Sequence, residues 1–332
     1  MTGLFQAGDR VQLTGHKGRR NTITLETGGV FHTHRGTLGH DLLIGLPDGS
    51  VVTGSDGTGY LALKPLLTDY VMSMPRGAAI VYPKDAGQIL ASADVTLGTR
   101  VVEAGVGSGA LTLWLLRAVG ATGSVHSVER RPEFAAVAED NVTGYFGARP
   151  GNWRLSHGDL VDVLDAGGEA AYDRAVLDML APWETVAAVR RALAPGGVVI
   201  AYVATVPQLS RTVEALRDTE AFTDPLPTET LIRGWHVDGL AVRPDHRMVA
   251  HTGFLVTARR LADGAVPPRS GRRASKDAWT DEDLEAWTPG AVGQREQSPK
   301  RLRRTARQAA EIAWARTAER PAAEPDADPG DR

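Results

Sequence analysis

The fold of this chain is decided by one stretch of sequence, Val101-Val102-Glu103-Ala104-Gly105-Val106-Gly107-Ser108-Gly109-Ala110-Leu111-Thr112. Its first residues are apolar and typical of a buried parallel strand, and its last residues begin an amphipathic helix. The Gly-x-Gly-x-Gly turn between them allows backbone angles that other residues resist and lets a ligand approach the main chain closely. A strand, a glycine-rich turn and a helix in this order predict a nucleotide-like ligand at the carboxyl end of the strand.

Strands and helices alternate on both sides of this stretch. We predict strands over residues 99–104, 123–129, 172–178, 197–202 and 253–258. We predict helices over residues 110–119, 132–146, 182–193 and 206–218. Such alternation is typical of a largely parallel sheet with helices on both faces. The predicted fold class of residues 69–262 is therefore α/β, a Rossmann-like doubly wound sheet.

The two ends of the chain differ from this middle part in composition. Residues 1–68 are rich in Gly and Thr and contain short alternating runs, which predicts a small β-rich N-terminal domain. Residues 263–332 can bury too little apolar surface to offset the entropy of ordering, so we expect a flexible charged tail. Within it, residues 298–316 have the pattern of a basic helix that binds RNA or a partner, with a solvated charged segment as the alternative.

Composition and charge exclude several classes of protein. The chain has 332 residues, with 40 acidic against 37 basic side chains and a formal net charge of −3. This balance disfavours a protein that coats nucleic acid by bulk electrostatics, although local basic patches remain open. The absence of cysteine excludes disulfides, thiolate metal sites and cysteine nucleophiles. No stretch reaches the roughly 20 apolar residues of a membrane span, and we expect a cytoplasmic protein.

The glycine turn itself distinguishes two kinds of ligand. The dinucleotide fingerprint needs Gly-x-Gly-x-x-Gly, whereas here the third glycine, Gly109, comes one position early, and the acidic Glu103 precedes the turn. A carboxylate at this place repels pyrophosphate but can pair with an ammonium group. S-adenosylmethionine has a cationic amino-acid end, a sulfonium and no phosphate. The sequence therefore favours S-adenosylmethionine as the ligand. An NAD-dependent oxidoreductase is the least favoured of the functions considered.

Two more acidic residues follow the next predicted strands. Glu129 is placed to accept hydrogen bonds from ribose hydroxyls, with a surface ion pair to Arg130 or Arg131 as the alternative. Asp159 is placed to accept a hydrogen bond from the adenine amino group of the cofactor. Because open α/β sheets bind ligands at the carboxyl ends of their strands, acids at successive strand ends predict one shared site.

Asp178 closes the fourth predicted strand, where a methyl donor and its acceptor should meet. A carboxylate that accepts a hydrogen bond from the N6 amino group of adenine would make N1 more nucleophilic and would stabilise the charge that develops there. The alternative is that Asp178 only caps the helix predicted to begin at Pro182.

Over residues 5–262 the chain resembles the bacterial and archaeal tRNA (adenine-N1)-methyltransferase family that acts at position 58, in the T-loop. The motifs that carry the resemblance are Met74-Pro75-Arg76-Gly77, Tyr82-Pro83-Lys84-Asp85, residues 103–112, residues 177–183, Glu229 with Arg233-Gly234-Trp235, Phe31-His32-Thr33-His34-Arg35-Gly36 and His251-Thr252-Gly253-Phe254.

The resemblance implies a class I methyltransferase that uses S-adenosylmethionine, a tRNA substrate, a homotetramer and no metal. It implies Asp178 and Tyr82 as catalytic residues, Tyr82 by stacking on the base, although simple packing is the alternative for Tyr82. The cofactor-binding residues that it implies are Glu103, Gly105, Val106, Gly107, Ser108, Gly109, Ala110, Leu111, Thr112, Glu129, Arg130, Asp159, Leu160 and Asp178. Methylation at position 57 as well remains open.

Some residues and functions keep alternatives. The spacing of His32, His34 and His40 suggests a metal-binding site, because alternate residues of a strand share a face. We favour instead packing or contact with RNA for residues 31–36. Arg233 and Arg243 are candidates for phosphate contacts or for surface ion pairs. A class I methyltransferase acting on another substrate and a non-catalytic RNA-binding subunit are the competing functions, and the retained acids disfavour the second.

The composition of the tail generates a prediction about stability. Deletion of residues 263–332 should leave the folded protein intact, because this segment contributes little apolar surface to a core. Thermal unfolding of the truncated and full-length chains should give closely similar midpoints. A large fall in the midpoint would show that the tail has a structural role.

Overall fold

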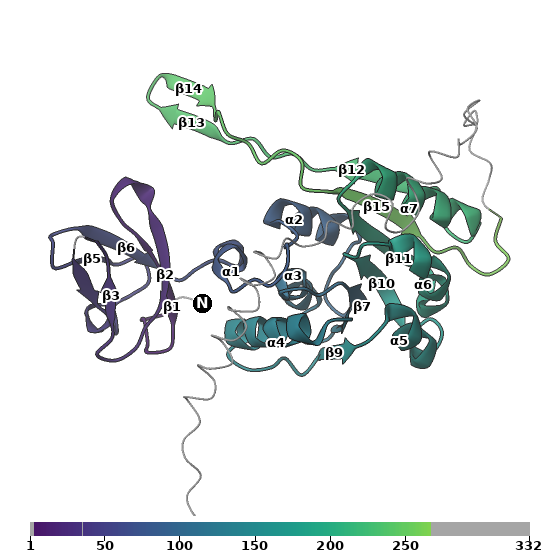
Figure 1. Ribbon diagram of the computed structural model, residues 1–332, viewed down its shortest axis with the longest axis horizontal. Coiled ribbons are helices and arrows are strands. Elements are labelled where there is room, and N and C mark those ends of the chain that lie inside the picture. The colour runs from purple at the N-terminus through teal and green to yellow at the C-terminus, as the bar shows by residue number, and fades with distance from the viewer. Residues whose placement is uncertain (1–2, 35, 267–332) are drawn as a thin grey trace, which may run out of the picture. The chain divides into compact units, whose positions relative to one another are not determined.

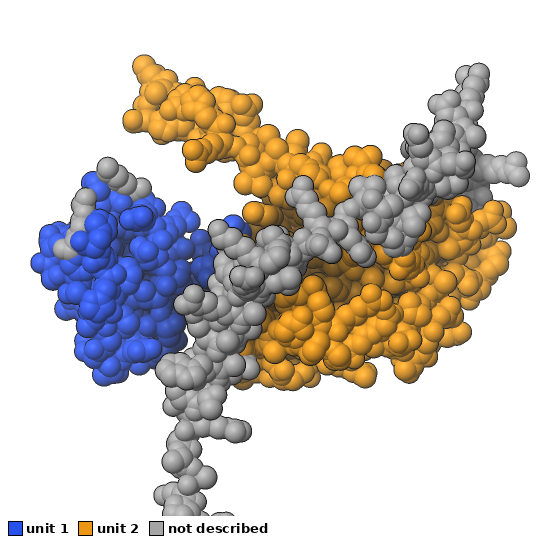
Figure 2. Space-filling model, viewed as in Figure 1, with its two compact units in different colours: residues 1–75 blue, residues 76–332 orange. Residues whose placement is uncertain are grey.

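The structure is a computed structural model, and it describes residues 3–34 and 36–266. The chain divides into two compact units, residues 1–75 and residues 76–332, hereafter the N-terminal and C-terminal units (Figure 2). The sequence placed this boundary after residue 68, whereas α1 (Leu67–Ser73) belongs to the N-terminal unit. The basic helix predicted over 298–316 lies outside the described residues.

The N-terminal unit is built from short antiparallel strands, as the sequence predicted. A four-stranded sheet has the order β2 (Arg20–Thr24), β1 (Arg10–Thr14), β6 (Gly59–Leu63) and β5 (Val51–Thr53). A second sheet pairs β3 (Val30–His32) with β4 (Thr37–Gly39), and two 3-10 turns cover His16–Gly18 and His40–Leu42. Alternate residues of β6 are buried because successive side chains of a strand point to opposite faces. The hydrophobic core of the N-terminal unit includes Phe5, Val11, Leu13, Leu25, Leu38 and Leu43.

The C-terminal unit contains a seven-stranded sheet with the order β12-β15-β11-β10-β7-β8-β9. Its strands are β7 (Arg100–Ala104), β8 (Ser124–Glu129), β9 (Trp153–His157), β10 (Tyr172–Leu177), β11 (Leu193–Val203), β12 (Leu226–Glu229) and β15 (Phe254–Arg259). The strands from β7 to β11 are parallel, while β15 runs antiparallel to β11 and to β12. The predicted doubly wound α/β class is therefore confirmed.

Helices cover both faces of this sheet. They are α2 (Pro83–Ser92), α3 (Ala110–Val119), α4 (Pro132–Phe146), α5 (Leu160–Gly167), α6 (Val186–Ala192) and α7 (Val206–Asp218). Figure 1 shows α2, α3 and α4 along one side and α5, α6 and α7 along the other. The single helix predicted over 182–193 is instead a 3-10 turn, Pro182–Thr185, followed by α6, and Leu193 already begins β11.

The order of the parallel strands determines where a ligand can bind. The chain moves outward from β7 through β8 to β9, then returns to the other side of β7 with β10 and continues to β11. The helices that follow β7 and β10 therefore leave the sheet on opposite faces, and their separation creates a crevice at the carboxyl ends of these two strands. The Gly-x-Gly-x-Gly turn follows β7, and Asp178 follows β10, so both lie at this crevice.

The C-terminal unit also contains a hairpin that the sequence pattern did not predict, formed by β13 (Trp235–Asp238) and β14 (Ala241–Pro244). In Figure 1 this hairpin extends away from the sheet and helices of its own unit. Its apolar side chains are exposed on both strands and at the turn, namely Trp235, Val237, Leu240 and Val242.

Among the described residues, no helix is long and apolar enough to cross a membrane.

Candidate active site

The turn after β7 is held against the end of β10 by a close backbone crossing. Gly105 has a φ of +83°, and a Cβ atom at this position would lie 1.7 Å from the carbonyl oxygen of Asp178. The Asp178 amide donates to the Ala104 carbonyl at 2.9 Å, and the Gly105 amide donates to the Val128 carbonyl at 3.2 Å. Only glycine fits here, because any side chain would both strain the backbone and displace the residue that follows β10.

Glu103 lies buried beneath this turn with one carboxylate oxygen satisfied and the other free. Its Oε2 accepts hydrogen bonds from Thr112 Oγ1 at 2.7 Å and from Ser127 Oγ at 2.6 Å. Its Oε1 is buried and has no partner within the described part of the chain. Burial raises the pKa of Glu103 to about 7, and the Glu129 carboxylate adds to the rise while the two hydroxyl donors oppose it. A buried acceptor without a donor is costly, so the site is suited to a cationic ligand.

Glu129 ends β8 and is 4% exposed, so it does not lie at the surface, although the ion pair with Arg131 that the alternative predicted is present. Its Oε2 accepts a hydrogen bond from the Gly107 amide at 3.0 Å, which fixes the glycine turn. Its Oε1 accepts from the Arg131 amide at 3.1 Å, and the Arg131 guanidinium lies 3.4 Å away. The carboxylate retains acceptor capacity beyond these bonds. Its contact with ribose hydroxyls stays a prediction.

Asp159 has structural partners that the sequence did not anticipate. It is the N-cap of α5, where its Oδ1 accepts from the Val161 amide at 2.8 Å. Its Oδ2 accepts from Arg130 Nε at 2.8 Å, and this guanidinium is the main reason that the pKa of Asp159 lies below its usual value. Leu160 is buried at the start of the same helix. The proposed contacts of Arg130, Asp159 and Leu160 with a cofactor stay predictions.

Asp178 does not cap a helix. The cap position of the following 3-10 turn is Ala181, and no side chain makes a capping bond there. No hydrogen bond to the Asp178 carboxylate is found within residues 3–34 and 36–266. Removal from bulk water raises the pKa of Asp178 to about 7, and the nearby Glu103 and Glu129 carboxylates contribute to the rise. An unpartnered carboxylate with a raised pKa beside a cavity is a candidate for chemistry.

A cavity of about 370 Å³ brings Asp178 together with Tyr82, the other predicted catalytic residue. Tyr82 precedes α2, and Asp178 follows β10, so the two reach the cavity from elements far apart in sequence. The remaining lining comes from residues 79–80, 179–180, 202–204, 208 and 252. Gln208, at the start of α7, donates to the Leu180 carbonyl at 2.9 Å and so ties this helix to the Asp178 loop.

A buried ion pair holds the wall of this cavity, and sequence analysis assigned it no role. The Lys84 ammonium donates to Asp85 Oδ1 at 2.8 Å, to the Thr230 carbonyl at 2.7 Å and to Thr252 Oγ1 at 2.6 Å. Thr252 Oγ1 in turn donates to Asp85 Oδ2 at 2.6 Å, and Tyr202 donates to the Thr252 carbonyl at 2.6 Å. All three protons of Lys84 are therefore used, as a buried ammonium requires. The signal in the sequence was that Lys84, Asp85 and Thr252 belong to the quoted motifs, whereas Thr230 and Tyr202 do not.

His251 contacts Ala204, which lines the same cavity. One ring nitrogen lies 2.7 Å from Glu229 Oε1, and the other lies 2.9 Å from the Ala204 carbonyl oxygen. Because a carboxylate and a carbonyl only accept hydrogen bonds, this geometry needs a proton on both nitrogens. The pKa of His251 is accordingly raised, first by the Ala204 carbonyl and then by Glu229.

The histidines of the N-terminal unit do not converge on one point. His40 is buried, and its Nδ1 accepts a hydrogen bond from the Glu26 amide at 3.1 Å, whereas His32 and His34 are exposed. Among the described residues, no group of three or more His, Asp or Glu side chains is arranged to hold a metal ion.

Two solved structures with this arrangement are methyltransferases, and the C-terminal unit has the class I methyltransferase fold. A SAM-dependent O-methyltransferase from Thermotoga maritima is 32% identical, with a TM-score of 0.73, and the match covers 79% of this chain and 96% of that chain. The tRNA (m1A58) methyltransferase TrmI from Aquifex aeolicus is 26% identical, with a TM-score of 0.69, over 78% of this chain and 100% of that chain.

Sequence comparison identifies the family. Residues 3–52 match the family described as TrmI-like N-terminal, and residues 60–240 match the family described as tRNA methyltransferase complex GCD14 subunit. The tRNA (adenine(58)-N(1))-methyltransferase TrmI of Thermus thermophilus is 38% identical over 253 residues, which are 75% of this chain and 95% of that protein. The tRNA (adenine(57)-N(1)/adenine(58)-N(1))-methyltransferase TrmI of Methanocaldococcus jannaschii is 32% identical over 67% of this chain and 84% of that protein. The chain belongs to the TrmI and GCD14 family of tRNA methyltransferases.

The backbone crossing at Gly105 can be tested by adding one methyl group. Gly105→Ala should lower the free energy of unfolding by at least about 3 kcal/mol, because the new Cβ collides with a backbone oxygen and strains a positive φ. Gly87→Ala, within α2, is the matched control, since no atom lies within 4 Å of a Cβ added there. Chemical denaturation compares the two variants with the parent protein. Equal stabilities would mean that the Asp178 loop moves aside freely.

Proposed function

We propose that this chain binds S-adenosylmethionine in its C-terminal unit and transfers the methyl group to N1 of the adenosine at position 58 of tRNA. The product is 1-methyladenosine. Family membership supports the tRNA substrate, and the curated relatives carry this activity in their names. The observation that carries the chemistry is the cavity that unites Tyr82 and Asp178 beside the acidic glycine turn.

The described residues fit this cofactor. Glu103 Oε1 and Ser108 Oγ are both buried without a hydrogen-bond partner in the described part of the chain. Glu103 precedes the glycine turn, and Ser108 lies within it. Glu103 would hold the ammonium of the methionine part, and Glu129 would accept from the ribose hydroxyls. The cofactor, when bound, supplies a methyl group on a positively charged sulfur. Its positive charge would also relieve the mutual repulsion of Glu103, Glu129 and Asp178.

Asp178 would act on the target base and not on the methyl group itself. The ionised carboxylate accepts a hydrogen bond from the N6 amino group, which pushes electron density toward N1. The N1 lone pair would accept the methyl group that the cofactor supplies, the sulfur would keep the electron pair of the broken S–C bond, and the adenine ring would gain a positive charge. A carboxylate aimed at this developing charge stabilises the transition state. No covalent bond to the enzyme forms, in agreement with a chain that lacks cysteine.

Tyr82 and the wall behind it would position the base. A base inside folded RNA must leave its stack before N1 can reach a methyl donor, at a cost of a few kcal/mol. The ring of Tyr82 offers a face on which the extruded base can stack. The buried Lys84–Asp85 pair, bonded to Thr252 and Thr230, holds the α2 start and the β15 approach together around this face. Alignment of the reacting atoms should supply most of the rate enhancement.

The homotetramer expected from the family is supported by the β13–β14 hairpin. An isolated two-stranded hairpin is at best marginally stable in water. Here its apolar side chains are exposed, with Trp235 60%, Val237 68% and Val242 57% exposed. Such surfaces mark protein–protein contacts, so we propose that the hairpin packs on a second copy of the chain.

Arg233 and Arg243 make no ion pair within the described residues, which favours their role as phosphate contacts.

One solved structure raises a second candidate function. The Thermotoga maritima protein carries the name O-methyltransferase, which implies a different acceptor atom. A class I methyltransferase with another substrate would have the same cofactor site, so only the methylated product separates the two functions.

The role of Asp178 can be tested by changing its charge alone. Asp178→Asn should lower kcat on unmodified tRNA by about 10² to 10³-fold, because an amide offers no negative charge to the developing cation. Asp173→Asn, at the other end of β10, is the matched control and should retain activity, since Asp173 only pairs with Arg100 there. Mass spectrometry should detect 1-methyladenosine in the intact transcript and none when the adenosine at position 58 is replaced.

Two outcomes would contradict these assignments. Full activity of Asp178→Asn would remove it from the mechanism. Cofactor binding without any methylated nucleoside would refute the tRNA assignment and favour another acceptor.

Cofactor binding should depend on pH. The pKa values of Glu103 and Asp178 are both raised to about 7, so both groups are mainly protonated below that pH. A cationic ligand binds the ionised carboxylates better, so affinity for S-adenosylmethionine should increase from about pH 5.5 to 7, with release of protons. This window lies below the range in which an α-amino group itself loses its proton. Isothermal titration calorimetry in buffers of different ionisation enthalpy measures the proton release. Proton uptake, or an affinity independent of pH, would show that the carboxylates do not face the cofactor.

A further inference from the structure

The N-terminal unit contains a hollow that the proposed methyl transfer does not use. It has a volume of about 530 Å³, within the range of pockets that hold small ligands. Its walls come from the turn between β1 and β2, from β3 with the turn that follows it, and from β6. The turn after β3 is held by its own bonds, because the Thr33 amide and Oγ1 both donate to the Gly36 carbonyl, at 2.9 Å and 3.0 Å. The protein's own hydrogen bonds therefore hold this part of the wall.

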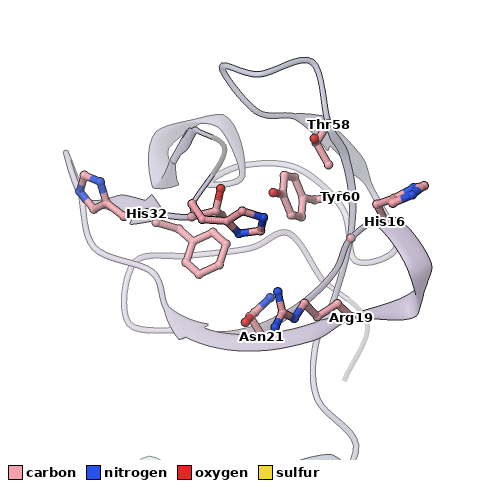
Figure 3. Close-up of a pocket in the computed structure, with 10 residues that line it drawn as sticks. His16, Arg19, Asn21, His32, Thr58 and Tyr60 are labelled. Carbon is pink, nitrogen blue, oxygen red and sulfur yellow. The ribbon is translucent and has the colours of Figure 1, made fainter.

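The lining is suited to an anion. Among the described residues that line the hollow, none has a carboxyl group, whereas Arg19 offers a guanidinium and Asn21 a side-chain amide as N–H donors. Arg19 is exposed, and its guanidinium makes no ion pair or hydrogen bond within residues 3–34 and 36–266. Arg19 and Asn21 line the same hollow, and Figure 3 shows His16 and His32 directed outward on opposite sides. An unpaired guanidinium and an amide in one hollow favour a phosphate with a polar group attached.

Tyr60 gives the hollow a fixed aromatic wall with a free hydroxyl. The side chain is only 7% exposed, and Phe31 packs edge-on against it with ring centroids 6.3 Å apart. A Cβ added at Gly15 would lie 2.9 Å from the Tyr60 ring, so the backbone also touches it. The Tyr60 hydroxyl has no hydrogen-bond partner within the described residues, and Figure 3 shows it pointing into the hollow. A nearly buried hydroxyl without a partner is matched to a ligand that supplies one.

We propose that this hollow binds one unpaired nucleotide of the tRNA substrate. Arg19 binds its phosphate, the base lies against Phe31 and Tyr60, and the Tyr60 hydroxyl and Asn21 bond to its polar edge. Unstacked bases that contact aromatic side chains, with a cation on the phosphate, are the usual form of single-stranded RNA recognition. This inference rests on the proposed tRNA substrate and adds a second contact, remote in sequence from the methyl-transfer cavity.

Two adjacent arginines make the test specific. Arg19→Ala removes a positive charge from the hollow, and Arg20→Ala removes one from a side chain that instead pairs with Asp69 at 3.4 Å. We expect Arg19→Ala to weaken binding of a full-length tRNA transcript by about tenfold and to reduce the salt dependence of binding by about one counterion. Arg20→Ala should weaken it by less than about twofold. Tyr60→Phe, which removes only the hydroxyl, should weaken binding by roughly threefold.

Filter binding of labelled tRNA to the full-length protein measures these affinities, whether or not a methyl group is transferred. Affinity for S-adenosylmethionine, kcat at saturating tRNA and the unfolding midpoint should stay unchanged in all three variants. Equal losses for Arg19→Ala and Arg20→Ala would overturn the proposal, because they would show bulk electrostatics. Binding of free adenosine monophosphate that depends on Arg19, with unchanged tRNA affinity, would also overturn it by assigning the hollow to a free nucleotide. Failure of the proposed function would appear separately, as absence of 1-methyladenosine with the parent protein.

Discussion

The site depends on one close backbone crossing, where the turn after β7 passes the residue that follows β10. Gly105 approaches the Asp178 carbonyl so closely that no Cβ fits between them. This crossing lies at the switch point of the doubly wound sheet, where helices leave toward opposite faces. The crossing places the glycine turn next to Asp178, the residue proposed to act on the target base. The rest of the C-terminal unit keeps these two segments in contact.

The crossing has an electrostatic consequence. Glu103, Glu129 and Asp178 lie at or next to the ends of neighbouring strands. Burial, with a lesser contribution from the neighbouring carboxylates, raises the pKa of Glu103 and Asp178 to about 7. Such an arrangement is unfavourable for the folded protein alone, and it becomes favourable when a cation binds among the three groups. Strain of this kind is typical of sites that are built for a ligand and not for maximal stability.

The sequence indicated the acids but not all of their partners. Strand ends predicted Glu103, Glu129, Asp159 and Asp178, because the period of the flanking residues identified each strand. The hydrogen bond from Arg130 to Asp159 and the role of Asp159 as a helix cap depend on side-chain geometry. The spacing of apolar residues carries no information about that geometry. The Lys84 ammonium bonds to Thr252, 168 residues away, and such a pairing depends on how distant elements meet.

Hydrophobic period and glycine placement are local properties of a chain, and they were enough to predict the α/β class, the position of the glycine turn and the acidic strand ends. The short alternating runs also indicated the β-rich character of the N-terminal unit. The unpartnered oxygen of Glu103, the cavity shared by Tyr82 and Asp178, and the hollow around Tyr60 could be seen only in the folded chain. These features depend on which side chains remain without partners after folding, and that follows from contacts between segments that are distant in sequence.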